Sequence, residues 1–294
     1  MASNWEIYTS HFEFHDELPL NEAPWGGHCF FAYDLVTNYK PKTIVELGTY
    51  KGYSFFSFAQ AVKDHKLDTQ LHCIDTWQGD KHAGFYDEGL YKGFIHIYKK
   101  YYKDVDVDIH RETFDGALKD FKDNSVDLLH IDGLHTYEAV KHDFKSWLPK
   151  VKKDGIIILH DVCEIRDDFG VYKLWKELQA KYKNTLTFEH FHGLGVIFLG
   201  KPPKVQEEFL MKYYSLRSEL ESLITSPEVN SINNYKREVD LLNMQIEDKS
   251  KLINELSEEV KDLATEVNEF RGFKKSPIWR TLVKWRKVKS FLRK

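Results

Sequence analysis

Short apolar runs alternate with amphipathic stretches over the first two thirds of the chain. The pattern predicts a helix over residues 26–40 and strands, mostly separated by helices, at 43–47, 70–74, 105–109, 126–131, 155–160, 186–191 and 194–199. Such alternation is typical of an α/β domain with a doubly wound, mostly parallel sheet, here of seven strands. The last two strands are expected to form an antiparallel pair, and Pro202 and Pro203 to end the domain.

Beyond these prolines, apolar residues recur at alternating steps of three and four. They occupy positions 232, 235, 239, 242, 246, 253, 256, 260, 263, 267 and 270, and Lys249 is the one break in the series. Branched residues at every first position and mostly leucine at the second favour a parallel two-stranded coiled coil. We therefore expect a helical linker over 204–230 and a coiled coil over 231–271 that makes the protein a homodimer. The alternative is one long amphipathic helix folded back on the first domain.

The C-terminal segment 272–294 is a basic amphipathic tail. Residues 271–294 hold ten Lys or Arg and no acid, so the net charge of −4 conceals a preceding part that carries −14. Ser276 and Pro277 suit a helix start, and tryptophan and leucine among basic residues are typical of a helix that lies on an anionic membrane. A solvated basic tail is the main alternative, and nucleic acid is not an expected partner.

Cysteine usage and the absence of long apolar runs bear on the cellular location. The three cysteines are odd in number and show no metal spacing, which argues against a disulfide framework and a zinc site. No run approaches the roughly 18 apolar residues of a membrane span, and the first residues lack a signal-peptide pattern. We expect a cytoplasmic protein that lies on the inner face of the cell membrane through its tail.

The run TIVELGTYKGYSFFSF at residues 43–58 reads as a buried strand, a glycine turn and the start of a helix. Its spacing, Glu46 followed by Gly48 and Gly52, matches neither a dinucleotide fingerprint nor a phosphate-binding loop. An acid beside glycines that let the backbone approach a ligand suits a cofactor with a positive charge and no phosphate. S-adenosylmethionine fits that description, whereas the alternative is a tight turn without a ligand.

A second strand, in TQLHCIDTW at 69–77, also ends in an acid, Asp75. Ligands of open α/β sheets bind outside the carboxyl ends of the strands, where such an acid accepts ribose hydroxyls. The alternative is that Asp75 caps the next helix. With Thr49, Thr76 and Trp77 in the adjoining turns, these residues complete the expected cofactor-binding set.

Over residues 25–200 the chain resembles the class I S-adenosylmethionine-dependent methyltransferases. Five segments carry the resemblance in the expected order: VELGTYKG, IDTWQGDKHAGFY, VDLLHIDGLHTYEAVKHDFKSWLPKVKKDGIIILHD, DFGVYKLWKEL and HGLGVIFLG. Within that class the chain is similar to a group associated with glycan biosynthesis and related to metal-dependent sugar O-methyltransferases. The resemblance implies a Rossmann-like methyltransferase domain over 1–203, and it does not name the acceptor.

Four ionisable residues follow two neighbouring strands of this domain. Asp132 and His135 come after the strand at 126–131, and His160 and Asp161 end the strand at 155–160. Adjacent parallel strands lie about 5 Å apart, so these side chains can converge at one rim. Methyl transfer to a hydroxyl requires removal of a proton and stabilisation of the developing alkoxide, which a histidine and a hard divalent cation can provide.

The resemblance implies a role for each of these residues. In the related sugar methyltransferases an acid at the Asp132 position and an acidic pair at the 160–161 position bind the metal, and a histidine at the His135 position is the base. His160 departs from that pattern, because an imidazole is a poorer magnesium ligand than a carboxylate. Either the site takes manganese or another transition metal, or it has no metal and His160 orients the substrate. His82 and His192 are further candidates to face the cleft.

These observations predict an enzyme that methylates a sugar hydroxyl in a bacterial surface polysaccharide. A small-molecule or phenolic O-methyltransferase is the alternative within the same enzyme class. The alternative from another class is a coiled-coil scaffold for a glycan assembly complex, with a degenerate methyltransferase domain. The intact Glu46, Gly48, Gly52 and Asp75 argue against degeneracy.

Overall fold

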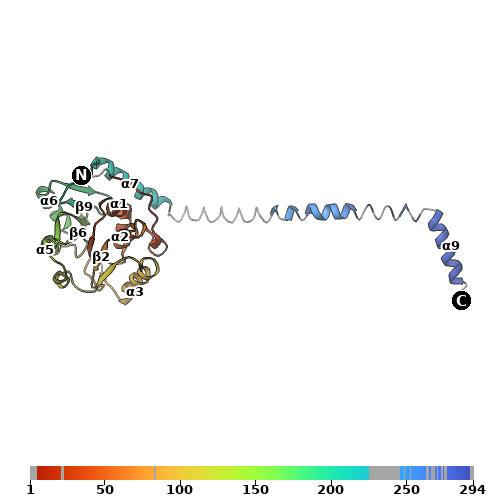
Figure 1. Ribbon diagram of the computed structural model, residues 1–294, viewed down its shortest axis with the longest axis horizontal. Coiled ribbons are helices and arrows are strands. Elements are labelled where there is room, and N and C mark those ends of the chain that lie inside the picture. Colours follow the sequence, from red (N-terminus) through yellow and green to blue (C-terminus); the bar gives the residue numbers. More distant parts are fainter. Residues whose placement is uncertain are drawn as a thin grey trace. The chain divides into compact units, whose positions relative to one another are not determined.

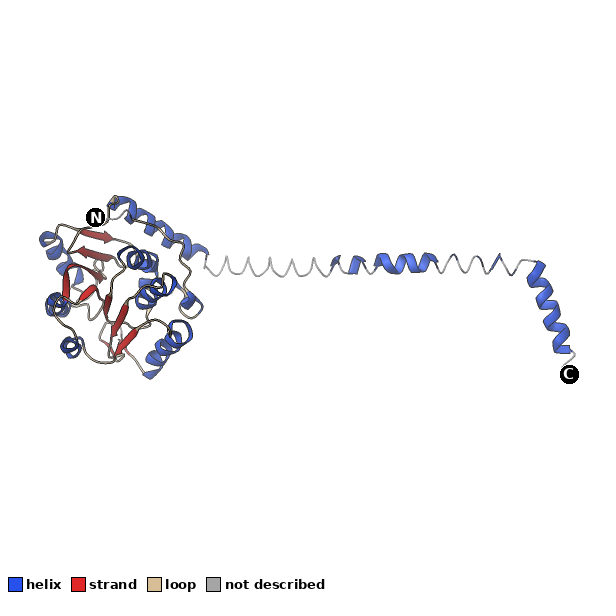
Figure 2. Cartoon of the chain, in the orientation of Figure 1, coloured by secondary structure: helices blue, strands red, loops and turns tan. Residues whose placement is uncertain are grey.

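The computed structural model (Figures 1 and 2) forms two compact units, Met1–Ser226 and Pro227–Lys294. The residues that it describes are 5–20, 23–82, 84–224, 246–247, 249–251, 253–262, 265, 269, 271–272, 274 and 277–291.

The first unit contains a seven-stranded sheet with the order β5-β2-β1-β6-β7-β9-β8. Its strands are β1 (Thr43–Leu47), β2 (Gln70–Ile74), β5 (Val107–His110), β6 (Val126–Ile131), β7 (Val151–His160), β8 (Thr185–Phe188) and β9 (Leu194–Phe198). The pairs from β5 to β7 are parallel, and β9 runs antiparallel to both β7 and β8. The mostly parallel sheet and its antiparallel end are thereby confirmed, although β7 begins four residues earlier than expected and β8 ends three residues earlier.

Helices cover both faces of this sheet (Figure 2). One apolar cluster joins the sheet to α1 (Cys29–Tyr39), α2 (Tyr53–Asp64) and α3 (Glu88–Ile97), and a second joins it to α4 (Phe114–Ala117), α5 (Tyr137–Trp147) and α6 (Val171–Lys181). Successive residues of one strand enter opposite clusters: Ile44 lies in the first and Val45 in the second. This alternation is the two-residue period of a strand buried on both faces.

Shorter elements complete the unit. They are the single-turn helices η1 (Glu13–Asp16), η3 (Pro24–His28), η4 (Tyr98–Tyr102), η5 (Leu118–Asp120) and η6 (Leu148–Lys150), and a small hairpin of β3 (Gly79–Asp80) and β4 (Gly84–Phe85). The expected helix over 26–40 is thus divided between η3 and α1. Pro24, which stands at the first position of η3, has no N–H to offer and suits the start of a helical turn.

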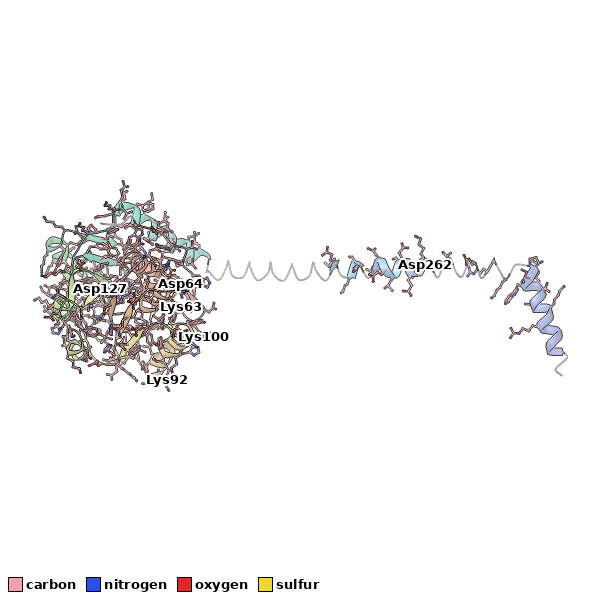
Figure 3. All side chains as sticks on the ribbon, in the orientation of Figure 1. Lys63, Asp64, Lys92, Lys100, Asp127 and Asp262 are labelled. Atoms are coloured by element: carbon pink, nitrogen blue, oxygen red, sulfur yellow. The ribbon has the colours of Figure 1, made fainter. Side chains whose placement is uncertain are left out.

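Asp127, labelled in Figure 3, fastens the amino end of β1 to β6. Its Oδ2 accepts the backbone N–H of Lys42 at 3.1 Å and that of Thr43 at 2.9 Å. Its Oδ1 accepts a hydrogen bond of 2.8 Å from Lys152 Nζ. The two central strands are therefore fixed in register at the edge opposite the one where their carboxyl ends meet.

Helix α7 (Glu207–Ile224) belongs to the first unit, which moves the boundary of the domain beyond the expected residue 203. The reason is packing: Leu210 and Tyr214 are fully buried against the core. Tyr214 donates a hydrogen bond of 2.5 Å to Asp34 Oδ2 on α1 and accepts one of 3.0 Å from Trp5 Nε1. The segment expected to be a linker therefore supplies part of the core.

The second unit is described in part. Most of the expected coiled coil, including all of 231–245, lies outside the described residues, as does the end of the expected linker, 225–230. The described residues at 246–247, 249–251 and 253–262 are helical, and Ile246, Ile253 and Val260 are more than half exposed. Helix α9 (Pro277–Phe291) begins at the expected proline. No helix among the described residues has the length and apolar character needed to cross a membrane.

The buried pair of Asp34 and Tyr214 leads to a prediction about stability. Burial is the main cause that raises the pKa of Asp34 to about 6, so this carboxyl favours folding below its unfolded pKa of about 3.9. That contribution is lost as pH rises through about 6. Tyr214→Phe removes a donor to the ionised carboxylate and should lower the free energy of unfolding by about 1–3 kcal/mol at pH 8, and by less at pH 5.

Urea unfolding of the two proteins at both pH values measures this difference. The control is Tyr213→Phe, because the hydroxyl of Tyr213 accepts a hydrogen bond from Arg217 and has no buried carboxylate as its partner. An equal loss in both variants, or a loss from Tyr214→Phe that does not depend on pH, contradicts the assignment.

Candidate active site

A cavity of about 520 Å³ opens at the carboxyl ends of β1, β2, β6 and β7. The turns that follow these strands supply Gly48, Thr49, Asp75, Thr76, Asp132, His135, His160 and Asp161 to its lining. Eight of the eleven residues predicted for the site are thus brought together around one space. Glu46, Gly52 and Trp77 are predicted site residues that do not line it.

Gly48 joins the turn after β1 to the loop after β6. Its φ is +90°, and a Cβ at this position would lie 2.0 Å from the carbonyl oxygen of Asp132. The Gly48 N–H donates to the carbonyl of Ile74 at 2.9 Å, and the Asp132 N–H donates to that of Leu47 at 2.8 Å. A side chain at residue 48 would therefore separate the strand ends that carry the cofactor turn and the acid–base residues.

Asp75 shapes the turn that is expected to hold the cofactor. Its Oδ2 accepts the backbone N–H groups of Thr49 and Tyr50, both at 2.9 Å, and its Oδ1 accepts that of Trp77 at 2.7 Å. A carboxylate has about four lone-pair positions, so about one remains on Oδ1 for a ligand. In this conformation Asp75 therefore has fewer free in-plane acceptor positions than the two that both ribose hydroxyls would require.

Thr49 and Thr76 also face the cavity. The Oγ1 atom of Thr49 is buried and has no hydrogen-bond partner among the described residues. A buried hydroxyl normally has a partner, so this atom is available to a bound ligand. The chemistry of the turn fits a cofactor that carries hydroxyl and amino groups.

Gly52 and Trp77 support the turn from behind it. Gly52, with φ of +97°, is the residue before α2, and a Cβ there would lie 2.5 Å from the ring of Phe56. Trp77 is 1% exposed, and its Nε1 donates a hydrogen bond of 2.9 Å to the carbonyl of Tyr50. Both residues are packed within the protein and do not line the cavity, and their contact with a cofactor stays a prediction.

Glu46 is completely buried beneath the cavity, where it cannot face the positive charge of a ligand directly. Its Oε1 accepts hydrogen bonds from Ser54 Oγ and from His130 Nδ1, the latter at 2.9 Å. His130 Nε2 in turn accepts from Trp25 Nε1 at 3.1 Å, which sets the proton of this imidazole on Nδ1. Since Trp25 and Ser54 line the cavity, Glu46 acts by orienting its wall.

The acid–base residues form one cluster at the ends of β6 and β7. His135 Nε2 lies 2.9 Å from Asp161 Oδ2 and 3.5 Å from Asp132 Oδ1. His160 Nδ1 lies 3.3 Å from Asp161 Oδ2 and 3.6 Å from Asp132 Oδ1. The expected convergence of the four side chains is thus present in the structure.

Charges in this cluster compensate one another. Burial disfavours the charged imidazoles, but the neighbouring carboxylates outweigh it and raise the pKa of His135 to about 9 and that of His160 to about 10. Although burial raises the pKa of both carboxyls, the histidines, His160 foremost, hold the pKa of Asp132 and Asp161 well below their ordinary range. At neutral pH the two imidazolium groups therefore act as the counterions of the two carboxylates.

Three ligand atoms in the cluster lie close enough together for a cation. They come from Asp132, His135 and Asp161, all within 4.8 Å of one another. His160, which was expected as a ligand, contributes Nδ1 to the same carboxylates from the buried side, and its Nε2 is buried without a partner among the described residues. Two carboxylates and an imidazole suit manganese or another transition metal better than magnesium.

An aromatic stack fixes the ring of His135. The ring of Phe169 lies 4.7 Å away at an interplanar angle of 1°, and the ring of His82 lies 5.7 Å away on a stacked plane. The Gly170 N–H donates to the carbonyl of His135 at 2.8 Å. His82 and His192 both line the cavity, as the sequence indicated.

Other parts of the cavity wall were not predicted from the sequence. Trp25, Tyr86, Phe114 and Arg166 line it, from segments that are distant in the chain. The hairpin of β3 and β4 lies beside Tyr86, and a glycine at 79 with φ of +75° makes room for it. The one feature of the sequence that could have indicated this wall is the aromatic content of the segments GDKHAGFY and DDFG, which have no regular apolar period.

Part of the chain is similar in sequence to known proteins. Residues 45–162 match the family model described as a methyltransferase domain. Over 180 residues the chain is 44% identical to the uncharacterized protein y4gI of Sinorhizobium fredii, an alignment that covers 61% of this chain and 19% of that protein. The chain therefore spans about a fifth of the length of that relative.

Among solved structures, the chain is similar to the S-adenosylhomocysteine-bound methyltransferase PaMTH1 of Podospora anserina, with 18% identity and a TM-score of 0.48 over 68% of this chain and 91% of that one. It is also similar to the O-methyltransferase TomG of Streptomyces achromogenes, with 15% identity and a TM-score of 0.47 over 66% and 92%. Both TM-scores are below 0.5, and we draw nothing about the substrate from them.

The segment that matches the family model runs from β1 to the end of β7, and so contains the glycine turn, Asp75 and the acid–base cluster. The strand order and the position of the cavity at the carboxyl ends of the strands agree with that match. Residues 45–162 are therefore similar to a methyltransferase domain, and they lie in a mostly parallel, Rossmann-like sheet with a cavity at its strand ends.

Proposed function

We propose that this protein transfers a methyl group from S-adenosylmethionine to a sugar hydroxyl of a bacterial surface glycan, such as an O-antigen. One observation carries the proposal: His135, 2.9 Å from Asp161, opens into the same cavity as Thr49 and Asp75. A base for the acceptor hydroxyl and a cradle for the methyl donor therefore share one space. Proximity of this kind is what group transfer between two bound molecules requires.

The walls of the cavity support a polyhydroxylated acceptor. Phe114 offers apolar surface to the carbon side of a sugar ring, while His82, paired with Asp168, and His192 and Arg166, both paired with Glu164, bring polar groups to the cavity wall. Binding sites for small ligands commonly combine such apolar surface with a few polar groups that fix orientation.

Asp132, Asp161 and His160, whose Nδ1 lies within 3.6 Å of both carboxylates, fit a divalent cation and leave His135 as the base. The fit rests on chemistry as well as distance, because the two carboxylates are now balanced by imidazolium groups whose positive charge a cation would replace. Bound there, a cation would stabilise a developing alkoxide and leave His135 free of its role as counterion. We propose that this cation is magnesium or manganese.

His135 is proposed as the general base. Its Nε2 faces the cavity cluster, and the parallel ring of Phe169 prevents the imidazole from turning away. With a cation balancing the carboxylates, His135 would be neutral and its Nε2 could take the proton of the acceptor hydroxyl, and Asp161, 2.9 Å away, would stabilise the imidazolium so formed. Burial of the cluster keeps water from competing for that proton.

The second unit is proposed to hold the enzyme at its substrate. A coiled coil over 231–271 would make a homodimer, and the basic residues of the tail would attract an anionic membrane at the cytoplasmic face, with about 1 kcal/mol for each cation near the surface. Two tails in a dimer bind more strongly than one. Glycans assembled on membrane lipids are acceptors that such an enzyme would meet there.

A methyl-transfer assay with labelled S-adenosylmethionine tests both the class of acceptor and the role of His135 as the base. We expect label in glycolipid extracted from cells that lack this protein, and none in catechol or other phenols. His135→Ala should lower turnover by about 10²–10⁴-fold, because a positioned base is lost, while cofactor affinity stays nearly unchanged. Chelator should suppress the reaction, and magnesium or manganese should restore it.

His96→Ala is the matched control, since His96 is exposed and remote from the cavity lining. Label in phenols alone would replace the sugar proposal by the small-molecule alternative. Label in no acceptor, with intact cofactor binding, would favour the scaffold. Full activity of His135→Ala would return this residue to a structural role, and full activity in excess chelator would remove the metal.

Cofactor binding is tested at Asp75 by calorimetry. Asp75→Ala removes the acceptor for ribose and for three backbone N–H groups, and should weaken S-adenosylmethionine binding by roughly 1.5–3 kcal/mol. Asp68→Ala, an exposed residue that precedes the same strand and pairs with Lys42, should bind as the parent protein does. Equal affinity in the parent and Asp75→Ala would remove Asp75 from the cofactor site.

The two proposed roles of the C-terminal region are separable, because one depends on apolar packing and the other on charge. Deletion of residues 271–294 should release the protein from anionic liposomes without changing its oligomeric state. The double substitution Ile246→Asp and Ile253→Asp should break the dimer, because it buries charge in the apolar seam. It should also weaken liposome binding, because a monomer lacks the second tail. Raised salt should also weaken that binding by screening.

Liposome sedimentation and light scattering measure these outcomes. Asn254→Asp is the control, because residue 254 lies outside the apolar series. A deletion that still pellets with liposomes would refute the role of the tail. A monomeric parent protein would refute the coiled-coil dimer.

A further inference from the structure

A second cluster of metal-ligating side chains lies on β2 and β5, apart from the residues that line the cavity. His72 is opposite Asp108 in the parallel register of these strands, and His110 is two residues further along β5. Paired residues of parallel strands, and residues two apart, point to the same face of a sheet. The three side chains therefore converge on one face at the edge of the sheet.

The distances within this cluster suit coordination. His72 Nδ1 lies 3.2 Å from His110 Nε2 and 3.6 Å from Asp108 Oδ2, and the ligand atoms of all three lie within 4.8 Å of one another. A tetrahedral zinc ion, with Zn–N bonds of about 2.0–2.1 Å, separates two ligating nitrogens by about 3.3–3.4 Å. The two imidazoles already stand close to that separation.

The surroundings of His110 match those of a metal-bound histidine. Its other ring nitrogen, Nδ1, lies 3.8 Å from Asp120 Oδ2, an ion-pair distance, and a carboxylate that moves into hydrogen-bond distance of that nitrogen would orient a metal-ligating imidazole. The ring of Phe121 lies 4.9 Å from that of His72 and 5.6 Å from that of His110. This ring shields the two imidazoles, while Asp108 remains half exposed and leaves the cluster open to solvent.

We propose that His72, Asp108 and His110 bind a zinc ion or a similar transition metal, with Asp120 orienting His110 and water completing the coordination. A direct hydrogen bond between the two rings would use one nitrogen lone pair and would leave Asp108 too distant to take part. A cation engages both nitrogens and the carboxylate together. Two imidazoles and one carboxylate are a donor set that suits zinc better than magnesium or calcium.

Such an ion would join the edge strand β5 to the interior strand β2 close to the cofactor turn. The carbonyl of His110 accepts the N–H of Asp75 at 3.1 Å, so the residue that bears a ligand also holds the loop of the proposed ribose acid. The site is therefore structural: it stabilises the strand end on which Asp75 depends. This role does not rest on the proposed methyl acceptor.

Calorimetric titration with zinc tests the site in the full chain carrying Asp132→Asn and Asp161→Asn, which removes the carboxylates of the other cluster. We expect one equivalent of zinc to bind, a melting temperature that rises with zinc concentration, and intense visible absorption of bound cobalt typical of four-coordinate sites. Asp108→Asn and His110→Gln should each abolish this binding. Asp120→Asn should weaken it by about 10–100-fold.

His142→Ala is the matched control, because His142 also pairs with an aspartate, Asp115, but on an exposed surface without further ligands. It should bind zinc as the parent does. Asp108 is half exposed, so in chelator Asp108→Asn should have the same melting temperature as its parent. Loss of zinc binding in this variant then reflects lost coordination and not lost folding. No zinc bound by the parent, or undiminished binding in both Asp108→Asn and His110→Gln, would overturn the proposal.

Discussion

The close approach of three strand ends at Gly48 is the constraint on which the site depends. The N–H of Gly48 is held by β2, the N–H of Asp132 is held by β1, and the Asp132 carbonyl occupies the space where a Cβ of residue 48 would stand. Because of this contact, the turn next to Asp75 and the loop that carries His135 border one cavity. A sheet whose ends were 1 Å further apart would separate donor and base.

Charge balance is the second organising feature. Two carboxylates and two imidazoles share the rim of β6 and β7, and each pair sets the ionisation of the other. Beneath them, Glu46 is fully buried and accepts hydrogen bonds from Ser54 and His130. The charges at the rim are thus balanced within one cluster, whereas Glu46 lies away from the ligand space.

The sequence predicted most of the fold because buried parallel strands and amphipathic helices have distinct apolar periods. The seven strands and the residues that follow β1, β2, β6 and β7 were found in this way. The burial of Glu46 could not be predicted, because the strand pattern locates an acid at the end of β1 but not its partner, His130. Helix α7 was assigned to a linker, because the burial of Tyr214 depends on contacts with Asp34 and Trp5, distant in sequence.

The aromatic wall of the cavity could not be predicted for the same reason. Tyr86, Phe114 and Phe169 come from irregular segments whose positions are set by glycine turns and by contacts across the sheet. The cluster of His72, Asp108 and His110 also has no signature in the spacing of residues along the chain. Its members are neighbours only through the register of β2 and β5.

The central claim is that one cavity at the strand ends holds the methyl donor beside His135. Hydrogen exchange of the full chain with and without S-adenosylhomocysteine, followed by mass spectrometry of peptides, tests it most directly. The account predicts slowed exchange in peptides that contain Gly48–Gly52 and Asp75–Gly79, and little change in α7 or at the β7 residues 151–155. Protection confined to other segments, or no protection at saturating ligand, would contradict it.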